Sequence, residues 1–440
     1  MKPMRMRRRR GIALLALLTS GLLAGGILPA QQAAQAPLAA ATQIAPGVSY
    51  EHVQQHGPAG EPWSIHILRV ARRQKGLRIA AVSGRTPEGH MARALPSEMA
   101  PTAAHAGDHL LATVNGDYDL AAPFFGISDG LSVTSGRLWT TGKPDWPAFA
   151  LLASGEPVIA VPAVHIEMRD GTRRVAIGAL NKPLGSGHGQ HPRAYTHEYG
   201  THLRSSNPFR AVVIGRLSPA LPLRVDRAVR GVVLETGEGV KALAIPPDAI
   251  VVAEWATESA LGSSATGVRF QRGDKVTLDF RIRMAGRKHV REAVGGFPLL
   301  VRDGRRSIEG QPTAYLSLRH PRTAACYNSR ELIFVVVDGR QPTLSLGMTL
   351  TELADLMVSL GCTVAMNTDG GGSSVMAVAL PASSPDAVSS TGIPKSGSPQ
   401  DSSSTSPLAP HTSPLRIVNS PSDGNERGRG NAWVVLAKKN

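Results

Sequence analysis

The sequence is poor in cysteine and in aromatic residues. Its 440 residues include two cysteines, Cys326 and Cys362, and 4% aromatic residues. Two cysteines allow one bridge at most, which excludes a disulfide-scaffolded fold. A single bridge and two small buried apolar side chains stay equally open. The chain is 42% hydrophobic, enough for the core of one large domain or two ordinary ones. No repeat with a period of about 20–50 residues is evident.

The positive charge is not arranged as a nucleic-acid site. Of the formal net charge of +15, six positive charges lie in the first ten residues, which leaves about +9 on the rest. The remaining Lys and Arg residues are dispersed and are not interleaved with aromatic residues, so we expect no nucleic-acid partner. The excess reflects either an arginine-rich proteome or an affinity for anionic polymers and phosphate-bearing substrates.

Residues 1–36 are typical of a signal peptide. A basic segment, "MKPMRMRRRR", precedes an apolar one, "GIALLALLTSGLLAGGIL", and "AQA" at 34–36 fits a cleavage site. Pro37 makes the exact cut uncertain, and the apolar segment nearly reaches the about 20 residues of an uncleaved membrane anchor. We predict export to the periplasm, cell envelope or medium, with no stable membrane insertion after cleavage.

The remaining chain predicts an α+β fold, with a large mixed β-sheet core, a C-terminal βαβ unit and few helices. We expect a tether at residues 37–60 and a β-rich part of the catalytic domain at 61–300. Residues 301–440 should form the part that carries the candidate catalytic residues. A Ser/Pro-rich stretch, 381–414, predicts a disordered surface insertion. The strands expected in the β-rich part are "WSIHILRV", "LRIAAVS", "HLLATVNG", "FALLA", "RAVVIG", "RGVVLE", "AIVVAEW" and "KVTLDFRIR".

Four histidines crowd one segment, 188–202, of the β-rich part: His188, His191, His197 and His202. Their spacing fits no standard metal-binding pattern, and histidines in loops are more often solvated than bound to metal. The identity of any metal ligand is therefore left open. We expect no required cofactor, with a divalent cation as the remaining alternative.

The segment 320–376 carries the strongest structural signals. "RTAACYN" and "ELIFVVV" are apolar runs joined by Asn328-Ser329-Arg330, which predicts a tight hairpin. "TLTELADLMVSLG" predicts a helix, since Thr349 and Glu352 form a capping box and Gly361 suits the C-terminal cap. The strand "TVAMN" then leads into "DGGGSS". Strand, helix and strand together predict the βαβ unit, with parallel strands and a right-handed crossover.

This topology predicts that polar residues gather at one sheet edge, where parallel strands end. In the hairpin, residue 322 should lie opposite residues 336–338. The residues expected at the edge are His320, Arg322, Asp338, Asn367, Asp369, Gly370, Gly371, Gly372, Ser373 and Ser374.

Such an edge suits a sugar phosphate. Glycine amides and Arg322 can hold phosphate oxygens, and Asp338 or Asp369 can act as base or nucleophile at a sugar carbon. His320 could donate a proton. A purely structural interpretation is a tight glycine turn with Asp369 as a cap. The presence of Arg322, His320 and Asp338 at the same edge favours a catalytic or binding site instead.

The same residues resemble the phosphodiester glycosidase family. The resemblance is dense over 295–376 and 416–436, in "GGFPLLVRDG", "HPRTAACYNSRELIFVVVDGR", "GMTLTELADLMVSLGCTVAMNTDGGGSSVM" and "VNSPSDGNERGRGNAWVVL". It is looser upstream, in "TVNGDYDL" and "LNKPLGSGHGQHPRAYTHEYG". Membership implies hydrolysis of a sugar phosphodiester at the anomeric carbon, which releases a sugar and a phosphomonoester.

The resemblance also implies site residues. The family's motifs fall on Asp369, Asp338 and His320, and the chemistry of these side chains makes them the catalytic candidates. The implied substrate-binding residues are Arg322, Thr323, Asn115, Asn367, Gly370, Gly371, Gly372, Ser373, Ser374, Glu426 and Arg427. Arg322 and Arg427 are expected on the phosphate. The nonfunctional alternatives are a turn-capping role for Asp338 and a solvated loop position for Arg427.

The sequence departs from the family where the sugar is expected. Asn115-Gly116-Asp117-Tyr118 stands where the family usually has Asn-Gly-Gly-Phe-Phe. Thr368 and Ser420 stand where leucine and arginine are common. Trp139 and Trp146 could stack on a sugar, although packing in the core or a loop is the more usual role of tryptophan.

Three functions fit these patterns. The first is an exported phosphodiester glycosidase acting on envelope or capsular sugar phosphates. The second is a non-catalytic envelope glycan-binding protein. The third is a metal-dependent phosphodiesterase that uses Asp338, Asp369 and loop histidines as ligands.

Overall fold

The computed structural model describes residues 41–185, 191–255, 267–308, 316–381 and 415–438. The predicted signal peptide and all but the first residue of the predicted insertion lie outside these residues. The described part consists mainly of β-strands, as expected, and two α-helices and three short 3-10 helices lie among them. No described helix has the length and apolar character needed to cross a bilayer.

The first sheet combines N-terminal and C-terminal strands, and every pairing in it is antiparallel. Its order is β1 (Thr42–Ala45), β2 (Val48–His56), β3 (Pro62–Ala71), β22 (Glu331–Val337), β21 (Arg322–Tyr327), β23 (Val364–Asn367), β19 (Leu299–Arg302) and β20 (Arg305–Arg306). The predicted tether was therefore wrong for residues 42–56. These residues pair as β1 and β2 because Val48 and Tyr50 are apolar and become buried in the core.

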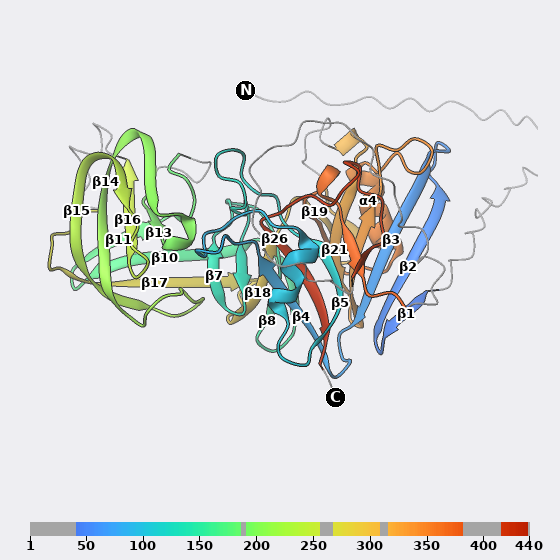
Figure 1. Cartoon of the computed structure of the whole chain (residues 1–440), viewed down its shortest axis with the longest axis horizontal. Coiled ribbons are helices and arrows are strands. Elements are labelled where there is room, and N and C mark those ends of the chain that lie inside the picture. The colour runs from blue at the N-terminus through green and yellow to red at the C-terminus, as the bar shows by residue number, and fades with distance from the viewer. Residues whose placement is uncertain (1–40, 186–190, 256–266, 309–315, 382–414, 439–440) are drawn as a thin grey trace, which may run out of the picture. The chain divides into compact units, whose positions relative to one another are not determined.

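The second sheet is formed by the middle of the chain. Its order is β11 (Arg173–Ile177), β10 (Pro162–Asp170), β17 (Lys275–Met284), β15 (Val229–Ala244), β14 (His202–Ser218), β16 (Ile250–Trp255), β13 (Arg193–Tyr195) and β12 (Ala179–Leu180). Its longest strands, β14 and β15, pair with each other and are labelled side by side in Figure 1. The β12–β13 pair is parallel, and the other pairs are antiparallel.

Two five-stranded sheets complete the described part. One has the order β7 (Arg137–Thr140), β6 (Ser132–Thr134), β18 (Val290–Gly295), β8 (Ala148–Leu152) and β9 (Pro157–Ala160). The other has the order β25 (Arg416–Ile417), β24 (Met376–Val378), β5 (His109–Asn115), β26 (Asn431–Ala437) and β4 (Leu77–Ser83). In the latter, β26 near the C-terminus (red in Figure 1) runs between β5 and β4 (blue), which places residues far apart in sequence side by side.

The helices are few and short. They are α1 (Pro96–Met99), α4 (Leu350–Ser359) and the 3-10 turns η1 (Ala100–Ala103), η2 (His197–Tyr199) and η3 (Gly371–Ser373). The capping box of α4 is confirmed: the Glu352 amide donates to Thr349 Oγ1 at 3.1 Å, and the Thr349 amide donates to Glu352 Oε2 at 2.9 Å. Gly361 follows the helix with φ +77°, the left-handed conformation that glycine adopts at little cost.

Strand β22 explains why "ELIFVVV" is almost continuously apolar. Ile333, Val335 and Val337 lie in one hydrophobic cluster with the buried face of α4. Phe334 and Val336, which alternate with them, lie in a second cluster with residues of β5, β8 and β26. Both faces of the strand are therefore buried, as a continuous apolar run requires.

The predicted hairpin is confirmed, and the predicted βαβ unit is not. Arg322 lies opposite Val337 in the β21–β22 pair, within the expected register. However, β22 and β23, the strands on either side of α4, do not pair with each other. Strand β21 lies between them and is antiparallel to both. The sequence pattern predicted the strands and the helix, but it could not show that the preceding strand is inserted between them.

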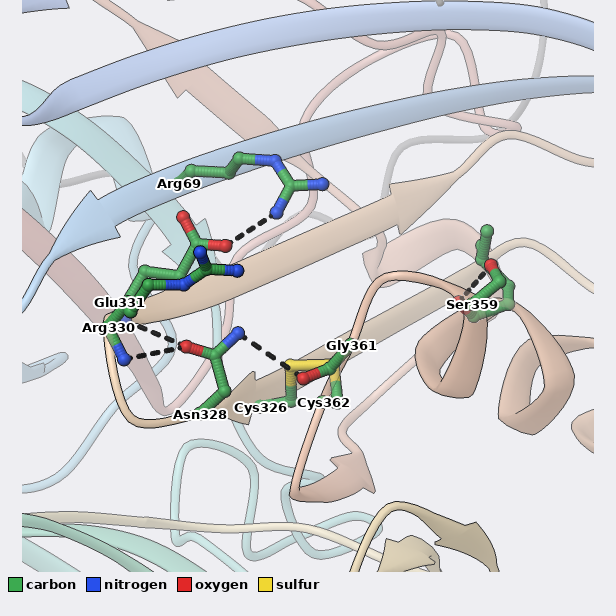
Figure 2. Close-up of a disulfide and its surroundings, with 9 residues drawn as sticks. Arg69, Cys326, Asn328, Arg330, Glu331, Ser359, Gly361 and Cys362 are labelled. Atoms are coloured by element: carbon green, nitrogen blue, oxygen red, sulfur yellow. Dashed lines mark hydrogen bonds and ion pairs between the residues drawn. A yellow bond between two sulfur atoms is a disulfide. The ribbon is translucent and has the colours of Figure 1, made fainter.

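The two cysteines form a disulfide. Cys326 on β21 and Cys362, just before β23, have Cα atoms 5.8 Å apart (Figure 2). Nearby, Asn328 Oδ1 accepts hydrogen bonds from the amides of Arg330 and Glu331, which stabilises the hairpin turn. Asn328 Nδ2 donates to the Gly361 carbonyl at 3.3 Å. The bridge and this hydrogen bond tie the end of α4 to the hairpin.

Candidate functional site

The glycine loop follows β23 directly and passes close to other segments. Gly371 has φ +63°, and its amide donates to the Pro321 carbonyl at 2.9 Å. A Cβ added at Gly370 would lie 2.8 Å from that carbonyl, and one at Gly372 would lie 2.3 Å from the carboxylate oxygens of Asp423. Both distances are shorter than a real Cβ contact. The three glycines are therefore needed for a left-handed turn and for two close approaches.

Asp369 stands at the start of this loop and is 8% exposed. Its amide donates to the Gly116 carbonyl at 3.0 Å, and its own carbonyl accepts from Asn115 Nδ2 at 2.8 Å. The carboxylate Oδ2 lies 2.7 Å from Arg429 Nη1. Burial raises the pKa of Asp369 above its ordinary value, against the lowering effects of the Arg429 charge and a Ser373 hydrogen bond.

Four side chains of alternating charge form what we call the charged row: Arg93, Asp119, Arg429 and Asp369. Arg93 Nε lies 2.5 Å from Asp119 Oδ2, and Arg429 Nη1 lies 2.7 Å from both Asp119 Oδ1 and Asp369 Oδ2. These two carboxylate oxygens are therefore at most twice 2.7 Å, or 5.4 Å, apart. The exposed fractions of the Arg429 and Asp119 side chains are 5% and 1%.

Sequence reasoning missed Arg429, Asp119 and Arg93. Arg429 belongs to the block "NERGRG", from which Glu426 and Arg427 were chosen instead. Arg429 reaches the site through its position in the fold. It lies two residues before β26, and β26 is the neighbour of β5, which leads to Asp119. That pairing joins segments more than 300 residues apart and is not visible in the sequence.

The predicted catalytic residue Asp338 is fully engaged. Oδ2 accepts from Ser64 Oγ at 2.8 Å and lies 2.9 Å from His66 Nε2, while Oδ1 accepts from Asn419 Nδ2 at 3.2 Å and the Ser420 amide at 2.8 Å. Burial alone would raise the pKa of Asp338, but these hydrogen bonds and the His66 charge hold it below its ordinary value. Both carboxylate oxygens of Asp338 therefore already have partners within the protein.

Asn419 connects Asp338 with the glycine loop. Besides the bond to Asp338, its Nδ2 donates to the Ser374 carbonyl at 3.1 Å, and its Oδ1 accepts from the Met376 amide at 2.9 Å. The predicted gathering of Asp338 and the glycine loop at one edge is thus observed, through an asparagine that the sequence analysis did not select.

Asn115 and Thr323 hold the base of the loop. Asn115 Oδ1 accepts from Thr323 Oγ1 at 2.8 Å and from the Val375 amide at 3.0 Å. With its bond to the Asp369 carbonyl, Asn115 joins β5, β21 and both ends of the glycine loop. These contacts are all internal, and through them Asn115 and Thr323 hold the loop in shape.

Asn367 lies beside a group of aromatic rings. Its Nδ2 donates to Tyr118 Oη at 2.8 Å and to the Phe297 carbonyl at 2.7 Å. Trp146 stacks on the Phe297 ring at 5.1 Å and meets the Tyr118 ring edge-on at 5.7 Å. Tyr118 and Trp146 are half-buried. Trp139, in contrast, is buried in a small cluster with Met91.

Three buried polar atoms near the loop have no hydrogen-bond partner among the described residues. They are Asn367 Oδ1, Ser374 Oγ and Arg429 Nε. A buried polar atom without a partner costs about 1–3 kcal/mol, so such atoms are normally satisfied by a ligand or water. Asn367 and Ser374 lie on either side of Asp369 in the chain, and Arg429 is its ion-pair partner.

The side chains of two arginines near His320 take different positions. Arg322 is buried, with Nε donating to the Met348 carbonyl at 2.9 Å and Nη2 to the Leu318 carbonyl at 2.8 Å. Arg340 is exposed, lies 3.4 Å from His320 Nδ1, and would be 3.1 Å from a Cβ at Gly371. Arg340 therefore borders the loop through its exposed guanidinium, whereas Arg322 borders it through its backbone and points its guanidinium at backbone carbonyls.

The same arginines act on His320. Burial lowers its pKa, and the charges of Arg322 and Arg340 lower it further. His320 is therefore neutral at pH 7, which makes it a weak proton donor there.

Glu426 and Arg427 take different positions. Glu426 accepts from the Ser97 amide at 2.8 Å and from Ser97 Oγ at 2.5 Å, and burial raises its pKa. Arg427 pairs with Asp423, is 44% exposed, and would be 2.5 Å from a Cβ at Gly372. Arg427 thus borders the loop, while Glu426 anchors the start of α1.

The histidine-rich segment shows no metal site in the described residues. His191 and His202 are exposed, and His197 Nδ1 lies 3.0 Å from the Ile245 carbonyl oxygen. His188 lies outside the described residues. No group of three or more His, Cys, Asp or Glu side chains in the described part could hold a metal ion.

The segment that contains this loop has known relatives. Residues 224–436 match the phosphodiester glycosidase family. The resemblance found in the sequence is thus confirmed over just under half of the chain. The matched segment includes Asp369, the three glycines and Arg429, whereas Asn115, Asp119 and Arg93 precede it. The sequence matches no curated protein.

Solved structures share the fold more widely. A hypothetical protein from Synechocystis aligns with a TM-score of 0.66 and 16% identity. The alignment covers 92% of this chain and 65% of the chain of that protein. A protein from Burkholderia pseudomallei named "Putative exported protein" aligns with a TM-score of 0.58 and 19% identity, over 86% of this chain and 74% of that one. Both establish a shared fold.

A third structure is more distant. It is the catalytic domain of zebrafish N-acetylglucosamine-1-phosphodiester alpha-N-acetylglucosaminidase, auto-inhibited by its pro-peptide. It aligns with 14% identity and a TM-score of 0.42, over 91% of this chain and 87% of that one. A TM-score this low does not establish a shared fold.

Proposed function

We propose that the protein is an exported phosphodiester glycosidase, which hydrolyses a sugar-1-phosphodiester at the anomeric carbon. The observation that supports this most strongly is the environment of Asp369. It is a buried carboxylate in the family-matched segment, paired with Arg429 at 2.7 Å, and it opens a glycine loop bordered by partnerless polar atoms.

We assign the catalytic carboxylate to Asp369. In the proposed reaction a water oxygen bonds to the anomeric carbon, and the bond from that carbon to the phosphate oxygen breaks. The electron pair leaves with the phosphomonoester, and the water proton is released. A phosphate leaving group needs little protonation, so a neutral His320 is no obstacle. Arg429 favours the ionised form of Asp369, which a base or nucleophile requires.

Asp119 is assigned a positioning role. In retaining glycosidases the two carboxyl groups are about 5–5.5 Å apart, and the oxygens of Asp119 and Asp369 are at most 5.4 Å apart. However, Asp119 already accepts contacts from Arg93, Arg429 and the Gly126 amide. Its bonds orient Arg429, and through Arg429 they orient Asp369.

We assign the phosphate to the open side of the loop, to Arg340 and Arg427. Both border the glycines and both are exposed, so their guanidinium groups can turn toward phosphate oxygens. The amides of Gly371, Ser373 and Ser374 already donate to carbonyls, which limits the backbone's share in binding phosphate.

We assign the sugar to the opposite flank, at Asn367 and the aromatic group. Half-buried Tyr118 and Trp146 offer apolar ring surface, and Asn367 Oδ1 offers an acceptor for a sugar hydroxyl. The substrate we propose is an envelope or capsular glycan phosphodiester. The N-terminal segment and the exported protein from Burkholderia support an extracytoplasmic location.

The test is hydrolysis of the methyl phosphodiester of N-acetylglucosamine-1-phosphate in ¹⁸O-labelled water, with and without EDTA. We expect the label in the sugar and no effect of EDTA, because we propose no required cofactor. Label in the phosphate with loss of activity in EDTA would instead indicate a metal-dependent phosphodiesterase. Binding without turnover would indicate a glycan-binding protein.

The matched variants are Asp369→Asn and Asp355→Asn. Asp355 is 58% exposed on α4 and pairs with Arg306, so its variant should retain full turnover. Asp369→Asn should lose turnover by at least about 100-fold while still binding the diester. Unchanged turnover in Asp369→Asn would refute the assignment of the catalytic carboxylate.

A further inference from the structure

A cavity of about 460 Å³ opens beside the charged row. We call it the side pocket. It is lined by Met91, Pro123, Phe124, Phe125, Ile127, Tyr199, His202, Arg204, Ser205 and Ser206. Its volume is in the range of small-molecule sites, which is about 300–1,000 Å³.

Phe125 connects the side pocket with the charged row. Its ring lies 3.8 Å below the guanidinium carbon of Arg93, and Arg93 contacts Asp119 at 2.5 Å. The next residue, Gly126, donates its amide to Asp119 at 3.0 Å. The pocket wall is therefore two side chains away from Arg429, the partner of Asp369.

The lining combines apolar and polar side chains from different segments. Met91, Phe124, Phe125 and Ile127 offer hydrocarbon and ring surface, and Phe125 is 41% exposed. His202, Arg204, Ser205 and Ser206 come from β14 and provide donors and a positive charge. An apolar group that ends in an anionic or hydroxyl group matches this lining.

We propose that the side pocket binds the aglycone of the substrate, the group esterified to the phosphate on the side away from the sugar. This inference rests on the proposed function. It specifies the substrate class as a sugar-1-phosphodiester whose aglycone is apolar or aromatic near the phosphate and polar at its far end.

The test compares 2-phenylethyl with methyl as the aglycone, since both are alkyl esters with similar leaving groups. Calorimetry with 2-phenylethyl phosphate and methyl phosphate measures product binding without turnover. We expect the phenylethyl ester to bind about tenfold more tightly, which equals ~1.4 kcal/mol. The kcat/KM values of the two sugar-1-phosphodiesters should differ in the same direction.

Two variants and one control test the location. Phe125→Ala removes the apolar wall, and Ser206→Trp fills the pocket from β14. Each should reduce the phenylethyl preference to about twofold or less. Leu234→Ala removes another exposed apolar side chain, 37% exposed and outside the lining, and should preserve the preference.

The outcomes separate the two proposals. Equal binding of the two phosphates, or a preference that survives both pocket variants, would overturn the side-pocket inference even if both diesters are hydrolysed. If neither diester is hydrolysed but the preference depends on Phe125 and Ser206, the pocket's ligand class is supported and the glycosidase proposal is refuted.

Discussion

Arg429 offers the sharpest test of the site, because it compensates two buried carboxylates at once. Its Nη1 lies 2.7 Å from Asp119 and from Asp369, and their side chains are 1% and 12% exposed. Arg429→Met keeps the length and apolar surface of the side chain and removes the charge. Both carboxylates then stay buried without this partner.

Removing one partner of a buried ion pair costs about 3–5 kcal/mol. Domains of this kind are stable by only about 5–15 kcal/mol, so the loss should be obvious in urea unfolding. The matched control is Arg427→Met, two residues earlier. Its pair with Asp423 is 44% and 34% exposed, and such surface pairs contribute about 0–1 kcal/mol.

The loss in Arg429→Met should depend on pH. Burial already raises the pKa of Asp369, and the Arg429 charge opposes that rise. Without the arginine the folded-state pKa rises further above the unfolded value. A raised folded pKa means that stability is lost as pH rises through it. The unfolding free energy of the variant should therefore recover when the pH is lowered from about 7 to about 5.

The assay is equilibrium urea unfolding of wild type, Arg429→Met and Arg427→Met at the two pH values, with circular dichroism as the signal. Equal losses in the two variants would refute the structural assignment of the charged row. A loss in Arg429→Met that does not change with pH would show that Asp369 is not the carboxylate left without a partner.

Two further predictions concern stability. Replacing both Cys326 and Cys362 with alanine opens a loop with a sequence separation of 36, and the unfolding free energy should fall by about 4 kcal/mol; a loss below about 1 kcal/mol in urea unfolding would contradict this. Burial raises the pKa of Asp117 to about 7 from the ordinary 3.8. The contribution of the protonated Asp117 carboxyl to the unfolding free energy is therefore lost as pH rises from about 4 to about 7. Asp117→Asn should flatten the pH dependence of the unfolding free energy across this range, and a slope equal to that of wild type would refute the assignment.

Local patterns in the sequence were enough to predict the elements around the site. Periodicity predicted β21, β22, α4 and β23, and the capping box of Thr349 and Glu352 marked the start of α4 within one residue. The register of the β21–β22 hairpin followed from its short turn. Each of these features depends on neighbours within about ten residues, where propensity and turn chemistry are decisive.

The partners of Asp369 could not be predicted in the same way. Arg429 and Asp119 approach Asp369 because β26 pairs with β5. In this pairing Trp433 lies opposite Val114, and these two residues are about 320 positions apart in the sequence. Nor could the sequence distinguish Arg322 from Arg340. Arg322 turns inward onto backbone carbonyls, while Arg340 has φ +60° and remains exposed beside Gly371.

The charges around the loop also bear on the proposed phosphate site. The charged row has two positive and two negative members, so it has no net charge to offer an anion. Arg427 is balanced by Asp423. Arg340 forms no ion pair with a carboxylate in the described part of the chain, and its neighbour His320 is neutral at pH 7 because its pKa is lowered. Arg340 therefore brings to the glycine loop a positive charge that no carboxylate of the described residues balances. In the proposed site the two tasks are separate: buried Arg429 would hold Asp369 in place, and exposed Arg340 would bind the phosphate.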